Sequence, residues 1–375
     1  MEWMARESIT LLDGGREAFP RMLQAIRSAR QSVYLEVYHL AREGVGDEFR
    51  RALSEAALRG VRVRVILDGW GSALDGRWLQ SMLEPDGAEV RIYHPLLALF
   101  TGRFRRNHRK ILLVDGEVAF LGGINIADEY GQLGPGRAPD LADEEPEWMD
   151  LAVELRGAPA AWMEARLRGE RPPRLPGPVQ IHLSGIGGGR RMRNIYRRAF
   201  GAARAEILAA HAYFLPDRRF VRSITSGARR GVKVVLLLAG RSDVPLARAA
   251  TVRLYRRLVE SGVEIREWMR SVHHAKVAVV DGEKVLLGSF NLDPLSLANL
   301  ESLVEIDDPE TARAARRWFE ARARLARHVP PEEATRGGWG GRIADVLGDV
   351  VARFSEWVGR LLSGGRGGGR GVGPR

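Results

Sequence analysis

The sequence contains no cysteine among its 375 residues. Disulfide bonds and thiolate metal sites are therefore excluded, and the composition suits a reducing compartment. No run of about 18 apolar residues occurs, so no stretch has the composition of a membrane-spanning helix. Residues 1–14 carry four charged side chains and no apolar core segment, so we expect no signal peptide. These absences together predict a cytoplasmic protein.

Lysine is almost as scarce. Only Lys110, Lys233, Lys276 and Lys284 occur among the 58 basic residues, and all the others are arginines. Two of these four lysines stand at matching positions in a repeated motif. A compact ammonium on a flexible stem therefore has a role there that a planar guanidinium would not reproduce.

The charge is strongly unbalanced, with a formal net charge of +11 and a pI near 10.5. Such a surplus indicates a polyanionic partner, and an anionic membrane surface or a nucleic acid would satisfy it equally well. The alternative is a basic surface that only confers solubility.

One short motif occurs twice, with every shared residue displaced by 166 positions, as from His108 to His274. The shared residues are a His-x-Lys triplet, an Asp-Gly pair, a Gly-Gly or Gly-Ser pair and an Asn: His108, Lys110, Asp115, Gly116, Gly122, Gly123 and Asn125, then His274, Lys276, Asp281, Gly282, Gly288, Ser289 and Asn291. The chain is therefore a tandem repeat with one chemical motif in each half.

Each copy predicts a buried β-hairpin, because two apolar runs flank the Asp-Gly turn. Alternate residues of a strand share a face, so the His and Lys of one copy project together, and the later glycines let the Asn return beside them. Imidazole, ammonium and amide together suit a phosphate group, which the His can attack or protonate. The alternative is an ordinary hairpin that begins with His and Lys, but two copies in register argue against it.

At these residues the chain resembles the phospholipase D superfamily, and most closely the bacterial cardiolipin synthases, in a short form without the N-terminal transmembrane helices of longer members. The resemblance covers roughly residues 7–330. Similar stretches outside the motif are 34–38, 60–69, 213–217 and 291–296. One departure is Gly123, where the superfamily motif often has Ser, so a hydroxyl contact is missing there.

The resemblance implies a single active site between two lobes, with His108 as nucleophile and His274 as acid and base. Lys110, Lys276, Asn125 and Asn291 would supply charge and donors, so no metal or other cofactor is expected. Acids at two places in the family orient the histidines, and Asp150 and Glu301 occupy them here. Asp115 and Asp281 precede glycines at hairpin turns, and we interpret them as structural.

The order of apolar segments predicts an α/β fold with a mainly parallel or mixed sheet flanked by helices in each half. The resemblance implies that the halves are two tandem phospholipase D-like lobes related by pseudo-two-fold symmetry. We place the first lobe at 1–170, a linker at 171–178 and the second lobe at 179–330. Within the lobes, Gly14 and Gly15 predict a turn, and 246–260 predicts one helix.

Two further segments have both apolar and charged residues. The stretch 95–106 combines Leu and Phe with arginines beside the first motif, as an interfacial lipid site would need, although it could equally fold over its own lobe. Residues 331–362 predict an amphipathic helix that either lies in a bilayer interface or docks on the protein. Residues 363–375, rich in Gly and Arg, are expected to be disordered.

We therefore predict a phosphatidyl transferase or phospholipase D that acts on anionic glycerophospholipids through a phosphohistidine. The most specific form is cardiolipin synthesis from two phosphatidylglycerols, by a monomer bound peripherally to the inner face of the cell membrane. A superfamily nuclease acting on nucleic acid is the main rival. A non-catalytic scaffold at the membrane surface is the third hypothesis, and the two intact motifs argue against it.

Overall fold

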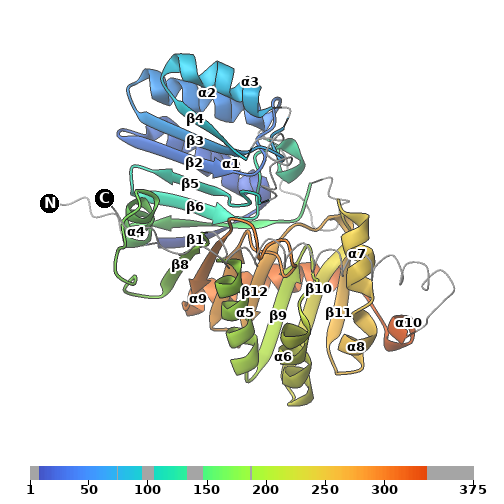
Figure 1. Ribbon diagram of the computed structural model, residues 1–375. Helices are drawn as coiled ribbons and strands as arrows, with labels where there is room; N and C mark the ends of the chain where they lie inside the picture. The colour runs from blue at the N-terminus through green and yellow to red at the C-terminus, as the bar shows by residue number, and fades with distance from the viewer. Residues whose placement is uncertain (1–7, 74, 95–104, 133–146, 186–187, 336–375) are drawn as a thin grey trace, which may run out of the picture.

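A computed structural model describes residues 8–73, 75–94, 105–132, 147–185 and 188–335 (Figure 1). Most of the stretch 95–106, most of the acidic loop before Trp148, and residues 336–375 lie outside these ranges. The predictions made for the interfacial loop, for most of the amphipathic helix and for the Gly and Arg tail therefore lie outside the described residues.

The first lobe is one mixed sheet of seven strands in the order β1-β7-β6-β5-β2-β3-β4. Its strands are β1 (Ser8–Asp13), β2 (Ser32–Val37), β3 (Arg62–Asp68), β4 (Glu89–Tyr93), β5 (Ile111–Val114), β6 (Val118–Gly122) and β7 (Leu151–Arg156). Its helices are α1 (Gly14–Ser28), α2 (Val45–Leu58), α3 (Gly76–Leu83) and α4 (Ala158–Leu167), with 3-10 turns η1 (Glu84–Asp86) and η3 (Asp128–Tyr130).

The second lobe repeats this plan in an eight-stranded sheet of order β15-β11-β10-β9-β12-β13-β14-β8. Its strands are β8 (Val179–Leu183), β9 (Glu206–His211), β10 (Lys233–Arg241), β11 (Glu264–Val272), β12 (Lys276–Val280), β13 (Lys284–Gly288), β14 (Ser302–Ile306) and β15 (Arg327–His328). Its helices are α5 (Gly189–Ala202), α6 (Arg218–Arg229), α7 (Pro245–Val252), α8 (Tyr255–Val259), α9 (Pro309–Leu325) and α10 (Pro331–Thr335).

The two sheets confirm the predicted α/β lobes, and both sheets are mixed. Among the strands of the described residues, parallel pairing is confined to β2, β3 and β4 and to their counterparts β9, β10 and β11. The motif hairpins β5–β6 and β12–β13 form as predicted, and each inserts beside the first parallel strand in antiparallel orientation. A tight hairpin reverses the chain, so its two strands pair antiparallel. The strands between each hairpin and the sheet edge also pair antiparallel.

The lobes pack through a shared apolar core between the two sheets. This core includes Leu113 and Val153 from the first sheet and Val279 and Val304 from the second. The outer face of the first sheet is covered by α1, α2 and α3, and that of the second by α5, α6 and α8. Because a common core fixes the two sheets, loops at the ends of their central strands are held in fixed relation across the interface.

Two local predictions were wrong. Gly14 and Gly15 begin helix α1 and do not form a separate turn; Gly14 takes a φ of 67°, which glycine adopts without strain. The helix expected over 246–260 is divided into α7 and α8 by a turn that Leu254 N–H closes on the carbonyl of Thr251 at 2.9 Å. Among the described residues, no helix combines the length and apolarity needed to cross a bilayer.

Candidate active site

The two motifs meet where the lobes contact each other. His108 N–H donates to the carbonyl of Leu300 at 2.9 Å, and His274 N–H donates to the carbonyl of Met149 at 2.8 Å. Each His therefore enters its hairpin while hydrogen-bonded to the backbone of the other lobe. The segments that follow Met149 and Leu300 carry the two predicted acids.

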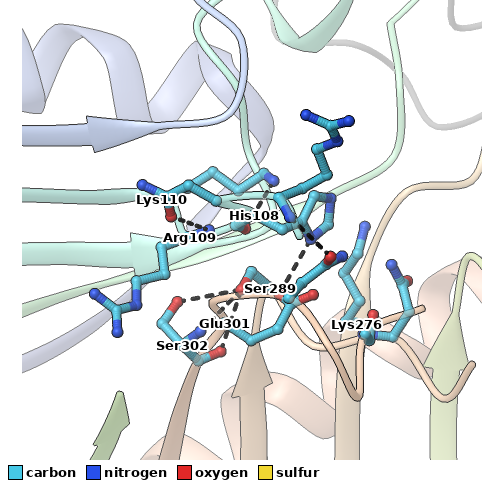
Figure 2. Close-up of polar contacts among 12 residues, drawn as sticks. His108, Arg109, Lys110, Lys276, Ser289, Glu301 and Ser302 are labelled. Carbon is cyan, nitrogen blue, oxygen red and sulfur yellow. Dashed lines mark hydrogen bonds and ion pairs between the residues drawn. The ribbon is translucent and has the colours of Figure 1, made fainter. Parts of the chain in front are cut away.

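Each catalytic His candidate pairs with an acid from the opposite lobe. Nδ1 of His108 lies 3.1 Å from Oε2 of Glu301, and Nδ1 of His274 lies 2.7 Å from Oδ2 of Asp150. Both carboxylates are fully buried, whereas the side chains of His108 and His274 retain 13% and 5% exposure. Figure 2 shows His108 in contact with Glu301, which is also bonded to Ser289, with Lys276 beside them. Each imidazole is thus oriented by a carboxylate of the opposite lobe.

This pairing decides which ring nitrogen is available for chemistry. A charged carboxylate only accepts hydrogen bonds, so Nδ1 of each His carries the donated proton when its partner acid is ionised. Nε2 then keeps a lone pair directed away from the acid. Two imidazoles in this state are suited to attack on phosphorus and to proton transfer.

Burial favours the neutral form of both imidazoles and lowers their pKa values. It lowers the pKa of His108, where Lys110 adds to the effect and Glu301 opposes it. Burial lowers the pKa of His274 further, with contributions from Lys276 and Lys110. Desolvation disfavours the charged form of a base, and nearby ammonium groups act in the same direction. The His that donates a proton must therefore gain it together with a negatively charged ligand.

The two lysines share this buried volume. Lys110 Nζ donates to the carbonyl of His108 at 3.0 Å, and Lys276 Nζ donates to the carbonyl of His274 and lies 2.9 Å from its Nδ1. Burial and then the ammonium of Lys276 lower the pKa of Lys110 to about 7. Burial lowers the pKa of Lys276 to about 8, against the attraction of Asp150. A phosphate between the two ammonium groups would offset their mutual repulsion.

The pKa of Asp150 is also shifted. Burial raises its pKa to about 7, although Lys276 and the backbone N–H of Leu151 favour its charged form. Leu151 N–H donates to Oδ1 at 2.8 Å, while Oδ2 accepts from His274. Both oxygens are therefore occupied, and the carboxylate is fixed in one orientation.

A steric constraint explains why position 123 is a glycine. A Cβ built on Gly123 would lie 2.4 Å from Oδ1 of Asp150, so any side chain there would displace this carboxylate. At the equivalent place in the second copy, Ser289 Oγ donates to Oε2 of Glu301 at 2.5 Å. The missing hydroxyl noted in the sequence is thus matched by a shorter acid, Asp150 in place of Glu.

The two asparagines lie in the same region with different contacts. Asn125 Nδ2 donates to the hydroxyl of Tyr130 at 2.8 Å, and that hydroxyl lies 3.3 Å from Nδ1 of His274. Asn291 N–H donates to Oγ of Ser296 at 3.3 Å. The side-chain oxygens of Asn125 and Asn291 are buried and have no hydrogen-bond partner among the described residues. They can accept from hydroxyl groups of a ligand.

Asp115 and Asp281 lie at the far ends of the hairpins. Each adopts a positive φ, of 53° and 54°, and its carboxylate accepts backbone N–H groups of the segment that precedes β2 or β9. Asp115 accepts from residues 30–32 at 2.7 to 2.8 Å, and Asp281 from residues 204–206 at 2.8 to 3.1 Å. These bonds anchor the hairpins to the sheets.

Sequence reasoning missed the aromatic wall around the two rings. Tyr38 lies edge-on to His108 at 5.3 Å between ring centroids and is 5.2 Å from Lys110 Nζ. Tyr130, Trp148 and Tyr213 lie within 5.4 to 6.5 Å of His274. One signal was available for Tyr130, since it follows Asn125 at the distance at which Ser296 follows Asn291. Tyr38 and Tyr213 follow strands whose ends are brought together only by the lobe contact.

Comparison with known proteins identifies the family. A family described as "Cardiolipin synthase, PLD-like domain" matches residues 22–131 and 196–323. Cardiolipin synthase B of Escherichia coli K12 is 36% identical over 322 residues, which cover 82% of this chain and 78% of that protein. Cardiolipin synthase 1 of Bacillus anthracis is 30% identical over 346 residues, covering 84% and 66%.

Among solved structures, phosphatidylserine synthase of Haemophilus influenzae superposes with a TM-score of 0.71 at 15% identity, covering 95% of this chain and 94% of the other. Polyphosphate kinase of Porphyromonas gingivalis has a TM-score of 0.55 at 14% identity, covering 95% and 57%. At these identities the superpositions establish the fold alone. The sequence matches establish the family, and the chain belongs to the phospholipase D-like cardiolipin synthases.

Proposed function

We propose that the protein is a phosphatidyl transferase that makes cardiolipin and glycerol from two molecules of phosphatidylglycerol. The observation that carries the proposal is the crossed pairing of His108 with Glu301 and of His274 with Asp150, beside two buried lysines. The proteins named cardiolipin synthase that match most of the chain support the choice of substrate.

In the first step, Nε2 of His108 attacks the phosphorus of one phosphatidylglycerol. A P–N bond forms, and the P–O bond to the departing glycerol breaks. His274 donates a proton from Nε2 to that glycerol oxygen, which leaves as an alcohol. The assignment of His108 as nucleophile follows the family resemblance.

In the second step, a hydroxyl of the second phosphatidylglycerol attacks the phosphohistidine. Its proton passes to Nε2 of His274, the new P–O bond forms, and the P–N bond to His108 breaks. Cardiolipin leaves, and both rings return to their starting states. The same route with water as acceptor would give hydrolysis, so the supply of an ordered hydroxyl decides between transfer and hydrolysis.

Positive charge stabilises the phosphorus centre in both steps. Lys110 and Lys276 would approach the non-bridging oxygens, and Asn125 and Asn291 would contribute amide groups. A phosphate held there favours the ammonium form of both lysines and the imidazolium form of His274, because opposite charge raises the pKa of a base. Asp150 and Glu301 keep the rings aimed at the phosphorus throughout.

We further propose that the protein works as a monomer, peripherally bound at the inner face of the cell membrane. Both histidines come from one chain, so a second subunit is not needed to complete the site. The substrate class is held in bilayers, so a peripheral position supplies access to it.

The proposal is tested by incubating the purified protein with phosphatidylglycerol vesicles and, separately, with single-stranded DNA. We expect cardiolipin and free glycerol from the vesicles, measured by mass spectrometry, and unchanged DNA. Cleaved DNA together with unchanged lipid would assign the protein to the nucleases. Binding to vesicles without any product would indicate the scaffold hypothesis.

A further inference from the structure

Helices α5 and α6 have a charge composition unlike that of their counterparts in the first lobe. The two helices carry nine arginines and no acidic residue. The equivalent helices α1 and α2 carry five arginines and four acids. The fold does not need the surplus, since the same plan is built in the first lobe with balanced charge. An excess on one pair of helices therefore points to a role outside folding.

These arginines lie on two neighbouring helices. Helices α5 and α6 lie side by side on the outer face of the second sheet (Figure 1). Eight of the nine are exposed, and the ninth, Arg193, is half-buried and pairs with Asp217 at 2.7 Å. Among the described residues, no other arginine of the two helices forms an ion pair with an acid. Burial, with help from Arg191 and Arg198, lowers the pKa of the neighbouring His182 to about 4, as expected beside strong positive charge.

A cavity of about 670 Å³ opens at the N-terminal ends of both helices. Its rim carries Arg190, Arg219 and Arg222, and its apolar lining includes Leu215, Leu292 and Leu297. Asp217, which pairs with Arg193, and Asp293 also line it. Beside it, on the same loop, Leu295 is 49% exposed. Guanidinium groups at the rim and leucines within are the combination that a phosphate joined to acyl chains requires.

Two segments lead from residues that line the cavity to residues of the active site. Leu292 follows Asn291 directly, and its carbonyl accepts from Leu215 N–H at 2.8 Å. Leu215 lies two residues after Tyr213, whose ring faces His274. A lipid held at the cavity would therefore have its head group near the second motif.

We propose that the arginine face, defined as the exposed arginines of α5 and α6 with the cavity at their N-terminal ends, docks the enzyme on an anionic phospholipid bilayer. The identity of the lipid rests on the proposed function, while the docking itself rests on the charge and the apolar cavity. A nucleic acid would also bind arginines, but a single-stranded one is held by exposed aromatic rings. On these helices Tyr196, Phe200 and Phe220 are all buried, so the face favours lipid.

The test compares two charge reversals of equal size in the full-length chain. Arg219→Glu/Arg222→Glu alters the arginine face, and its acids lie in the first turns of α6, where they favour the helix dipole and should not impair folding. Arg313→Glu/Arg317→Glu is the control, because both are exposed on α9, which packs on the opposite face of the second sheet. Binding is measured by flotation with phosphatidylglycerol–phosphatidylcholine vesicles and with pure phosphatidylcholine vesicles.

Each basic side chain at an anionic surface contributes about 1 kcal/mol, so we expect Arg219→Glu/Arg222→Glu to weaken binding to the anionic vesicles by about 30-fold or more. The control should change it by less than about threefold. Binding of the unaltered protein should fall with added salt and be weak on neutral vesicles. Equal losses in the two variants would show only a general charge effect and would overturn the proposal. Full displacement of the vesicles from the arginine face by DNA at physiological salt would also overturn the proposal.

A second pair of variants tests the apolar part. Leu295→Ser should weaken vesicle binding at high salt, where the apolar contact remains, whereas Leu58→Ser on α2, 69% exposed, should not. Turnover of phosphatidylglycerol dispersed in detergent separates this proposal from the proposed function. Intact turnover with unchanged vesicle binding in Arg219→Glu/Arg222→Glu would refute the docking face alone. Absent turnover in every form, with selective loss of binding, would refute only the function.

Discussion

Nδ1 of His274 lies 2.7 Å from Oδ2 of Asp150, although the two residues are 124 positions apart and belong to different lobes. His108 and Glu301 repeat this relationship in the other direction over 193 positions. The orientation of each imidazole therefore depends on the packing of the two lobes as well as on its own hairpin.

The first prediction concerns the histidines. Because both are proposed to act on one phosphorus atom, His108→Ala and His274→Ala should each lower turnover of phosphatidylglycerol by about a thousandfold or more. His328→Ala, at an exposed position on β15, is the matched control and should retain activity. A near-normal rate in either motif variant would contradict the shared site.

The second prediction concerns the crossed acids. Asp150→Asn and Glu301→Gln keep the shape of each side chain but remove the charge that holds Nδ1–H, so turnover should fall by between about 10²- and 10⁴-fold. The expected sign of a positioning role is a large fall in kcat with little change in KM. If the two variants instead raised KM alone, the acids would belong to substrate binding.

Gly123 provides a steric prediction. In Gly123→Ser the new Cβ would meet the Asp150 carboxylate at 2.4 Å, so the hydrogen bond to His274 should be lost. We expect at least a tenfold loss of turnover and a loss of stability of about 1–3 kcal/mol, measured by chemical denaturation. Gly201→Ala is the control, since a Cβ there meets nothing within 4 Å. Unchanged activity in Gly123→Ser would mean that the carboxylate can move without consequence.

The pH dependence follows from the buried cations and Asp150. As pH rises through about 7 to 8, Lys110 and then Lys276 lose their protons in the free enzyme, so kcat/KM should fall. As pH falls through about 7, Asp150 gains a proton and loses the negative charge that orients His274, so kcat/KM should fall again. The profile should be a narrow bell whose flanks belong to the coupled groups together.

Lys110→Arg isolates the alkaline flank. Arginine stays charged throughout this range, so the flank should move to higher pH while the maximum rate drops, because the planar group cannot take the ammonium position. Steady-state kinetics on detergent-dispersed phosphatidylglycerol from pH 5.5 to about 9.5 would measure both effects. A flank that stayed in place would assign the alkaline limb to another group.

The sequence was informative wherever local pattern controls structure. The hairpins at Asp115 and Asp281 and the alternation of strands and helices follow from turn residues and apolar runs. The crossing of Asp150 and Glu301 could not be predicted, because matched spacing fixes residues within a copy but not the direction in which the copies face. Tyr38 and Tyr213 were missed for the same reason, since their contacts with the rings arise from the lobe interface.

The pairing of each His with an acid of the opposite lobe also limits how the two lobes can be recombined or can diverge in sequence. A chimaera that took one lobe from a distant relative would keep every residue of each motif, yet it would pair both imidazoles with foreign acids. Each acid and its neighbour would then have to fit an imidazole ring in a slightly different position. These neighbouring pairs are Gly123 with Asp150 in the first lobe and Ser289 with Glu301 in the second. Recombination between such genes should therefore disrupt the His–acid pairs between the lobes before it disrupts the fold of either lobe.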